Sequence, residues 1–449
     1  MAQVILRKIR TARHLISRFV AMWCEKGLAT AARTGTKRAS HIIAQGRAAH
    51  WLQAAAEAAA RPFRAKPNAN SALLIGYIDA QLGLGQSLRG LALALSRTAI
   101  SFRIYPFGVG VEGRRVGSYM PERYDEVRAH AANIIEVSPD ELPQIFNHIS
   151  ESHFDRSYNI LRTYWELGKA PESWRRNLDH IDEIWAPTNF VANSFTPIFR
   201  KKITVIPPSL ELPPVPVEGR QRFNIELDRF YFLFSFDYYS SPARKNPKAV
   251  LQAFRLAFPD VSTRAGLIIK STGAIDHYPD IKEELLREAE HDNRIAIIDE
   301  TINREEMLAL IKAADCYVSL HRAEGFGLGM VEAMAFGKPV IATDYSGSTD
   351  FLSEETGYPV PYRLTEVGAD EYVHAEGQVW AEPSVSDCAR IMSHVFHNRD
   401  EAAARAQRAQ ALVNERYSPA NVGRLAEKRL NEIFAARAKT SGAGKPKVR

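Results

Sequence analysis

Residues 315–352, DCYVSLHRAEGFGLGMVEAMAFGKPVIATDYSGSTDFL, decide the fold of this 449-residue chain. The apolar run 316–320 predicts a buried parallel strand. A polar turn with glycines follows over 321–329, and the small, apolar residues 330–336 predict a helix that a glycine and a proline end. A second apolar run, 339–342, predicts the next strand. The stretch therefore reads as strand, glycine-bearing turn, helix and strand.

The turn in this unit predicts a binding site for an anion, because backbone N–H groups at a helix start attract negative charge. Glu324 in the turn and Glu332 on the helix are both expected to face the crevice at the carboxyl end of the sheet. Carboxylates repel phosphate but accept hydrogen bonds from hydroxyl groups. The combination fits a nucleoside diphosphate attached to a sugar. The alternative is an ordinary solvated helix start.

The pattern E-x7-E, written EGFGLGMVE and followed by AMAFGKPVIATDYSGSTDFL, resembles the donor-site signature of glycosyltransferase family 4. The resemblance implies retaining enzymes with the α/β GT-B fold, in which two Rossmann-like parallel-sheet domains face each other across a cleft. It implies that Glu332 holds the ribose hydroxyls and that Glu324 touches the sugar. It further implies catalysis without a metal or other cofactor. The donor-site loop that would meet the phosphates comprises Gly325, Phe326, Gly327, Leu328 and Gly329.

Composition is that of a globular protein, with 45% hydrophobic and 24% charged residues. The three scattered cysteines have no metal-site spacing and favour a reducing compartment. Residues 1–66 carry 13 Lys or Arg and two acidic residues, whereas the remainder is net acidic although the tail 437–449 is basic. Basic ends on an acidic enzyme suit an anionic membrane surface better than nucleic acid.

Residues 4–23 predict a basic amphipathic helix, with one apolar face that includes Phe19 and Trp23. Such a helix could anchor the protein at an anionic membrane surface, or pack on its own domain or on a partner. No apolar run is long enough to span a bilayer, and no signal peptide is recognised. The sequence thus predicts a cytoplasmic protein, either free or peripheral on the inner face of the membrane.

The first predicted domain, 71–206, alternates strands with helices, as a parallel sheet requires. Gly83 and Gly85 follow its first strand and allow close approach of a ligand, or serve a tight turn alone. The glycine loop of family 4 enzymes, which this one resembles, lies near the acceptor. Glu166 follows a later strand and is a candidate for the crevice. The acceptor-side catalytic group stays open, because the histidine common in this region of the family is missing here.

A proline-rich linker is predicted at 207–228 and a second Rossmann-like domain, binding the donor, at 229–415. Arg244 and Lys245 precede a helix there, where the helix dipole disfavours cations and an anionic partner is therefore expected. The family resemblance assigns Lys245 to the donor diphosphate. A second phosphate-binding cation is missing, or is Arg244 or Lys270. A terminal helix over 418–436 is expected to cross back to the first domain.

The resulting prediction is a retaining transfer of sugar from a nucleoside diphosphate to an acceptor hydroxyl, with Lys245 and the loop amides stabilising the departing diphosphate. Surface polysaccharide or lipid-linked glycan synthesis is the usual setting of the enzymes that this chain resembles. The alternatives are an inactive sugar-nucleotide-binding scaffold, a GT-B epimerase or phosphorylase, and a nucleic-acid binder that uses residues 1–66. The sequence does not identify the sugar, the base or the acceptor.

Overall fold

The computed structural model describes residues 68–111, 117–125, 130–149, 151–215, 219–223, 225–273 and 278–442. The predicted amphipathic helix at 4–23 and the whole of the predicted extension, 1–66, lie outside these residues, as does the end of the basic tail. In the described part of the chain, no helix is both long enough and apolar enough to cross a membrane.

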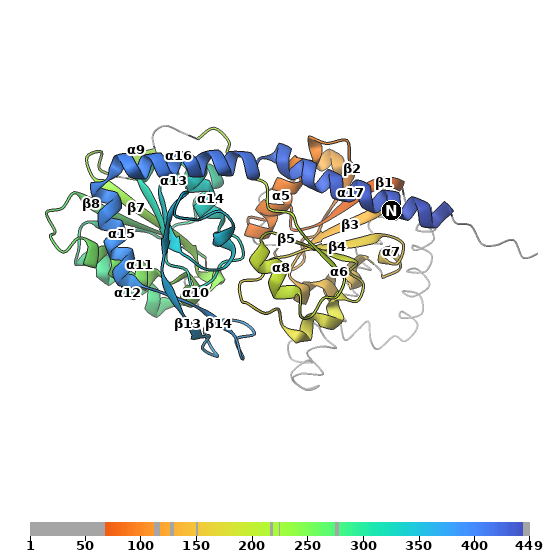
Figure 1. The fold of residues 1–449 in the computed structure, drawn as a ribbon, viewed down its shortest axis with the longest axis horizontal. Coiled ribbons are helices and arrows are strands. Elements are labelled where there is room, and N and C mark those ends of the chain that lie inside the picture. Colours follow the sequence, from red (N-terminus) through yellow and green to blue (C-terminus); the bar gives the residue numbers. More distant parts are fainter. Residues whose placement is uncertain are drawn as a thin grey trace, which may run out of the picture. The chain divides into compact units, whose positions relative to one another are not determined.

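The first sheet has six strands in the order β2-β1-β3-β4-β5-β6 (Figure 1). The strand pairs β1–β2, β1–β3 and β5–β6 are parallel. The strands are β1 (Asn68–Gly76), β2 (Ser101–Pro106), β3 (His130–Glu136), β4 (Tyr158–Arg162), β5 (Glu183–Ala186) and β6 (Lys202–Val205). The α-helices along this part of the chain are α5 (Gly83–Ser96), α6 (Leu142–Ile149), α7 (Glu151–Phe154) and α8 (Asn189–Phe195).

The second sheet also has six strands, in the order β12-β11-β10-β7-β8-β9, and all five neighbouring pairs are parallel. Its strands are β7 (Phe230–Asp237), β8 (Ala265–Thr272), β9 (Ile295–Ile298), β10 (Cys316–Ser319), β11 (Val340–Thr343) and β12 (Tyr358–Val360). The helices are α9 (Gly219–Arg222), α10 (Pro242–Lys245), α11 (Pro247–Ala257), α12 (Pro279–Glu290), α13 (Arg304–Ala313), α14 (Leu328–Ala335), α15 (Val385–His397) and α16 (Arg399–Arg416).

Alternating side chains of the second sheet bury both of its faces, because successive residues of a strand point to opposite sides. Phe232 and Phe234 of β7 join one apolar core with α11 and α15. Tyr231 and Leu233 join the other core with α13, α14 and α16. The strands are therefore almost continuously apolar, as sheets covered on both faces are.

Residue contacts divide the chain into two compact units. The first comprises the described residues within Met1–Leu82, Ile100–Ile160 and Leu430–Arg449. The second comprises Gly83–Ala99 and Leu161–Arg429. The predicted domain and linker boundaries stay predictions. Every site residue discussed below lies in the second unit.

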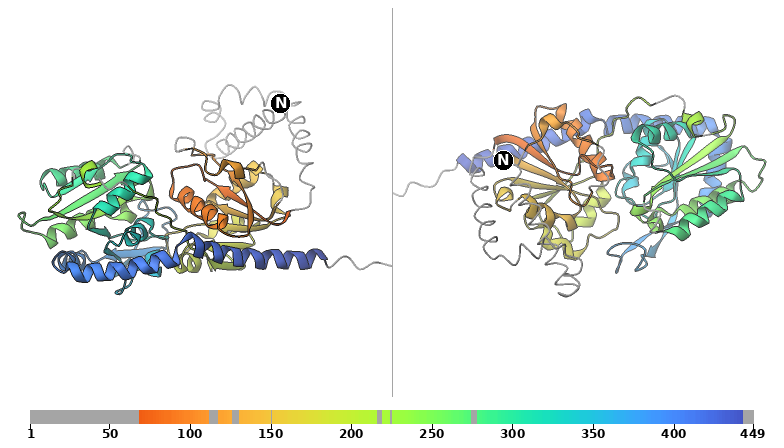
Figure 2. Two further views of the ribbon diagram at one scale, coloured as in Figure 1. Left: turned by 90° about the horizontal axis from the view of Figure 1, so that it is seen from above. Right: turned by 180° about the vertical axis from the view of Figure 1, so that it is seen from behind.

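The structure adds a two-stranded antiparallel hairpin, β13 (Tyr362–Glu366) and β14 (Val379–Pro383), that the sequence reading did not predict. It also shows a short helix, α9, within the predicted linker, and the helix α16, which was not predicted. The predicted terminal helix is longer than expected: α17 runs over Pro419–Gly442 and is dark blue in Figures 1 and 2.

Candidate active site

A buried histidine, His321, anchors the loop between β10 and α14. The imidazole of His321 is fully buried, and it hydrogen-bonds through Nδ1 to Ser319 Oγ at 3.1 Å and through Nε2 to Ser348 Oγ at 3.2 Å. Burial lowers the pKa of His321 to about 4, against the opposing field of Glu324. The ring is thus neutral at physiological pH and serves as an anchor for the loop.

The segment that follows β11 also hydrogen-bonds to this loop. Glu324 N donates to Ser346 Oγ at 2.8 Å, and Gly347 N donates to Glu324 O at 2.8 Å. A Cβ on Gly347 would lie 2.3 Å from Gly325 O, closer than real contacts allow. The glycine is therefore required by the close approach of the two loops, and the pair of loops fixes the backbone of Glu324.

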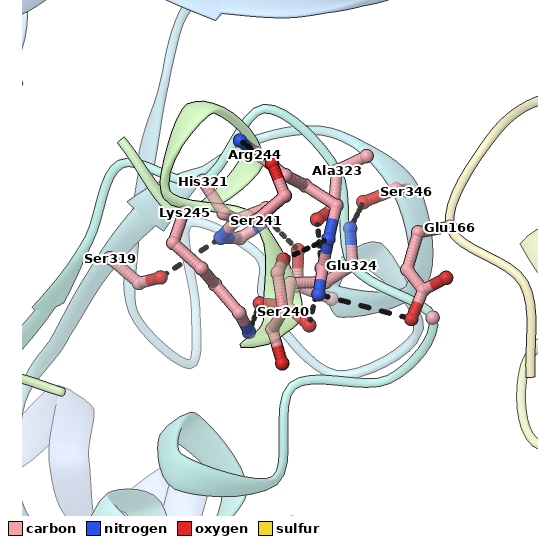
Figure 3. A network of polar contacts seen from close by, with 12 residues as sticks. Glu166, Ser240, Ser241, Arg244, Lys245, Ser319, His321, Ala323, Glu324 and Ser346 are labelled. Atoms are coloured by element: carbon pink, nitrogen blue, oxygen red, sulfur yellow. Dashed lines mark hydrogen bonds and ion pairs between the residues drawn. The ribbon is translucent and has the colours of Figure 1, made fainter. Parts of the chain in front are cut away.

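Two cations from the short helix α10 meet the Glu324 carboxylate (Figure 3). Lys245 Nζ forms an ion pair with Oε1, and Arg244 Nη1 lies 3.3 Å from Oε2. Both partners come from the pair that the sequence places just before the helix now seen as α11. The α10 turn ends at Asn246, whose φ of +59° breaks it from α11 and allows the two cations to reach the loop.

The two cations outweigh the effect of burial on the pKa of Glu324, whereas burial has the larger effect on the pKa of Lys245. Burial raises the pKa of Glu324, but the fields of Lys245 and Arg244 overcome that effect and lower it to about 2. Burial lowers the pKa of Lys245, and Glu324 opposes that shift. Glu324 is consequently a carboxylate throughout the physiological range, able to accept hydrogen bonds but not to donate them.

Glu166, the candidate from the loop after β4, joins the cluster. Its Oε1 lies 3.9 Å from Arg244 Nη2, and its Oε2 accepts a hydrogen bond of 2.8 Å from the hydroxyl of Tyr372. Arg244 also stacks over the Tyr372 ring, and its Cζ atom lies 5.6 Å from the ring centroid. Tyr372 was missed by the sequence reading. The only available signal before it was the partial alternation of Tyr362 and Leu364 with Arg363 and Thr365 in β13.

Both candidates for a second phosphate-binding cation donate to protein acceptors. Arg244 donates to Ala323 O at 2.8 Å and to Ser240 O at 3.1 Å, and is 3% exposed. Lys270 is equally buried and donates to Glu300 O at 2.7 Å. These contacts fit residues that hold the site together. Lys245 also pairs with a protein group, Glu324, but its side chain is 17% exposed, so it is the better candidate to contact the diphosphate.

The donor-site loop 325–329 leads into α14 with its amides toward the helix start. Gly327 has a φ of +97°, which only glycine adopts readily. Gly329 makes room for Tyr317, whose hydroxyl would lie 2.5 Å from an added Cβ. Among the described residues, no acceptor takes a hydrogen bond from the amides of 326–329. The loop therefore presents the donors that an anion needs.

Glu332 lies on α14 and has a partner different from those of Glu324. It is 2% exposed and forms an ion pair with Arg304, the first residue of α13. Burial raises the pKa of Glu332, and Arg304 opposes that shift. Burial raises the pKa of the Tyr317 hydroxyl, and the negative charges of Glu332 and Glu324 raise it further. The two predicted carboxylates thus both affect the same tyrosine but pair with different cations, Glu324 with Lys245 and Arg244 and Glu332 with Arg304.

Gly83 and Gly85 stand at the start of α5, as the first predicted glycine loop requires. Gly85 is buried, whereas a Cβ on Gly83 would meet nothing within 4 Å. Near them, Ser87 Oγ lies 2.6 Å from the Tyr164 hydroxyl. Packing therefore does not explain why position 83 is glycine.

We expect Gly83→Ala to leave the free energy of unfolding within about 1 kcal/mol of wild type, because alanine favours a helix and has space here. If the backbone at Gly83 approaches a substrate, the same change should lower turnover by about tenfold. Urea unfolding and initial rates measure the two effects. Unchanged rates would assign the glycine to the turn alone.

The described residues contain no group of three or more His, Cys, Asp or Glu side chains that could hold a metal ion. The site is instead built from paired charges, loop amides and hydroxyl groups. Such a set can neutralise a diphosphate and accept hydrogen bonds from a sugar.

Residues 220–410, which contain this cluster apart from Glu166, match the family model described as glycosyl transferases group 1. A D-inositol 3-phosphate glycosyltransferase from Arthrobacter sp. (strain FB24) is 25% identical over 243 residues, which cover 49% of this chain and 52% of that protein. The chain thus spans about half the length of this curated relative.

Solved structures resemble the fold over about four fifths of the chain. Sucrose-phosphate synthase from Thermosynechococcus elongatus superposes with a TM-score of 0.61 at 16% identity, covering 83% of this chain and 100% of that one. Anabaena Alr3699/HepE, solved with UDP and glucose, superposes with a TM-score of 0.57 at 15% identity, covering 81% and 99%. The predicted GT-B fold is confirmed, and within it residues 220–410 are the part of the chain that matches glycosyl transferases group 1.

Proposed function

We propose that this protein is a retaining glycosyltransferase of the family 4 type, which moves a sugar from a nucleoside diphosphate to an acceptor hydroxyl. The observation that carries the proposal is the Lys245–Glu324 pair beside the donor-site loop, inside the region that matches glycosyl transferases group 1. A cation, a row of amides and a carboxylate together suit a diphosphate joined to a sugar.

In this mechanism the residues act mainly through charge. Lys245 and the amides of 326–329 take up the negative charge that develops on the departing diphosphate, and they are already in place before reaction. Glu324 accepts hydrogen bonds from sugar hydroxyls and so orients the anomeric carbon. Glu332 accepts hydrogen bonds from the ribose. The anomeric bond to the diphosphate breaks as the bond to the acceptor oxygen forms on the same face, and the acceptor proton goes to the leaving phosphate.

Glu166 lies near Nη2 of the Arg244 guanidinium, whereas Glu324 lies near Nη1, and we propose that Glu166 meets the acceptor. We propose a glycan or lipid-linked acceptor, and a role in the synthesis of surface polysaccharide or lipid-linked glycan. The name of the Arthrobacter relative adds D-inositol 3-phosphate as an acceptor to include in assays. The membrane association proposed for residues 4–23 is a separate question, which vesicle binding would answer.

A thermal-shift panel of nucleoside diphosphates and their sugars tests the proposal on wild type and on Glu332→Ala. UDP is the first probe, since Alr3699/HepE was solved with it. A nucleotide at about 100 times its dissociation constant should stabilise the native state by about 2.7 kcal/mol. We expect one base to raise the melting temperature of wild type and of Glu305→Ala, an exposed control on α13, and Glu332→Ala to lose most of the shift. If no nucleotide raises the melting temperature, the donor-site assignment is refuted and the scaffold alternative is favoured.

A further inference from the structure

Arg304 stands in an electrostatically unfavourable place. It is the first residue of α13, where the helix dipole disfavours a cation. The helix start does not need it, because Asn303 and Glu306 already form a reciprocal capping box, with Asn303 Oδ1 accepting from Glu306 N at 2.9 Å. Neither capping nor the dipole explains an arginine at this position.

Its partner is a carboxylate on a different helix. The Arg304 guanidinium forms an ion pair with Glu332 Oε1 on α14, a helix in contact with α13. The two side chains differ in exposure, at 31% for Arg304 and 3% for Glu332. The arginine therefore reaches from a partly open position onto a carboxylate that is otherwise buried, and an ion buried in this way is costly unless it is paired.

The pair leaves half of the carboxylate available. In the described part of the chain, Oε2 of Glu332 accepts no hydrogen bond, whereas Oε1 faces Arg304. The nearby Tyr317 hydroxyl is hydrogen-bonded to Ser235 Oγ at 2.7 Å. The charged group that acts on Glu332 is Arg304 from α13, while Glu332 and Glu324 from the preceding loop both act on the Tyr317 hydroxyl. The cation nearest Glu332 is thus Arg304.

We infer that Arg304 is a positioning residue of the nucleotide site: it holds Glu332 ionised and turned so that Oε2 accepts a hydrogen bond from a ribose hydroxyl. The inference rests on the proposed function, in which Glu332 takes the ribose. Burial raises the pKa of this carboxyl and Arg304 lowers it, so the arginine sets the lowest pH at which the acceptor persists.

The test is the pH dependence of nucleotide binding, from pH 5 to 8, for the nucleoside diphosphate that stabilises wild type. The proteins are wild type, Arg304→Met, Arg304→Lys and Arg222→Met. Arg222 is a matched control, because it pairs with Glu306 on α13, at 3.1 Å, and is 48% exposed. The nucleotide's own phosphate titrates equally in all four experiments, so the readout is each variant's dissociation constant divided by that of wild type.

For Arg304→Met we expect this ratio to rise about tenfold or more as the pH falls, because without the cation the Glu332 carboxyl is protonated at a higher pH than in wild type. Protonation removes an acceptor, so binding is lost on the acid side. Arg304→Lys, which keeps the charge, should follow the wild-type profile, and Arg222→Met should give a flat ratio near one. If the ratio of dissociation constants for Arg304→Met does not change with pH, the positioning role is refuted, even if the ratio is large at every pH.

The same titration with the 2′-deoxy and 3′-deoxy nucleotides tests separately whether Glu332 binds the ribose and whether Arg304 positions Glu332. If Glu332→Ala binds the ribonucleotide as wild type does, the ribose site itself is wrong and the proposed function fails there. If Glu332→Ala loses binding and the preference for the ribonucleotide while Arg304→Met keeps both, only the role of Arg304 is refuted. We expect both variants to lose discrimination against the deoxy analogues, Glu332→Ala at every pH and Arg304→Met most at low pH.

Discussion

Lys245→Ala should lower the turnover of a nucleotide sugar by about 100- to 1000-fold, the usual cost of removing one preorganised charge donor from a transition state. Lys245 is the cation nearest Glu324 and is only 17% exposed, so water cannot fully replace it. The loss should appear mainly in kcat, because charge on the diphosphate grows as the anomeric bond breaks. Release of nucleoside diphosphate from the sugar nucleotide found in the binding panel provides the assay.

Lys248→Ala is the matched control for this experiment. Lys248 lies three residues further along, pairs with Glu284 and is 49% exposed. We expect its rate to stay within about twofold of wild type, as exposed ion pairs contribute little. If Lys245→Ala and Lys248→Ala were equally active, the diphosphate would have to be neutralised elsewhere, and the role of Lys245 in the proposed mechanism would be withdrawn.

Arg244→Leu should destabilise the protein by about 3–5 kcal/mol, the range found when one partner of a buried ion pair is removed. The change takes away the charge that lies between Glu324 and Glu166 and leaves two carbonyl acceptors, Ala323 O and Ser240 O, without their donor. Urea unfolding measures the loss. Arg264→Leu is the control, since Arg264 pairs with Asp228 and Glu226 at the surface and is 49% exposed.

The loss in Arg244→Leu should also depend on pH. Glu324 has a folded pKa of about 2, below its value of about 4.3 in unfolded chains, so it stabilises the wild type above the unfolded value. That stabilisation disappears as the pH falls through the interval between these two values. Without Arg244 the folded pKa of Glu324 is higher and there is less stabilisation to lose, so the stabilities of wild type and variant should converge progressively as the pH falls from about 4.3 toward about 2. Parallel curves would mean that packing, not charge, accounts for the loss.

The second sheet could be predicted well because its signals are local. The runs 231–236 and 339–342 and the apolar start of 267–271 place apolar residues on both faces, which few structures other than covered parallel strands allow. The start of helix α13 at Arg304 is also marked locally, because its capping residue and its acidic first turn are neighbours in the sequence. The hairpin β13–β14 was missed because its strands are short, and twelve residues with turn-forming glycines separate them.

The sequence predicted which residues form the candidate site better than it predicted which of them contact one another. Glu324, Lys245 and Arg244 were singled out from the sequence, and the structure brings their side chains together. The pairing of Glu332 with Arg304 had no sequence signal, because an ion pair across two helices depends on how α13 packs beside α14. The contact of Tyr372 with Glu166 joins positions 206 residues apart and could not be read from either neighbourhood.

The ion pair between Lys245 and Glu324 has a consequence for how a donor is recognised. A diphosphate that binds this ammonium competes with the carboxylate for its N–H groups, so phosphate capture weakens the Lys245 contact of Glu324. The Glu324 carboxylate, still paired with Arg244, can then accept hydrogen bonds from sugar hydroxyls in its place. A nucleoside diphosphate without its sugar lacks these hydroxyl donors. Under the proposed function, the pair thus couples recognition of the two halves of the donor, and intact sugar nucleotides should be preferred over the diphosphates that remain after transfer.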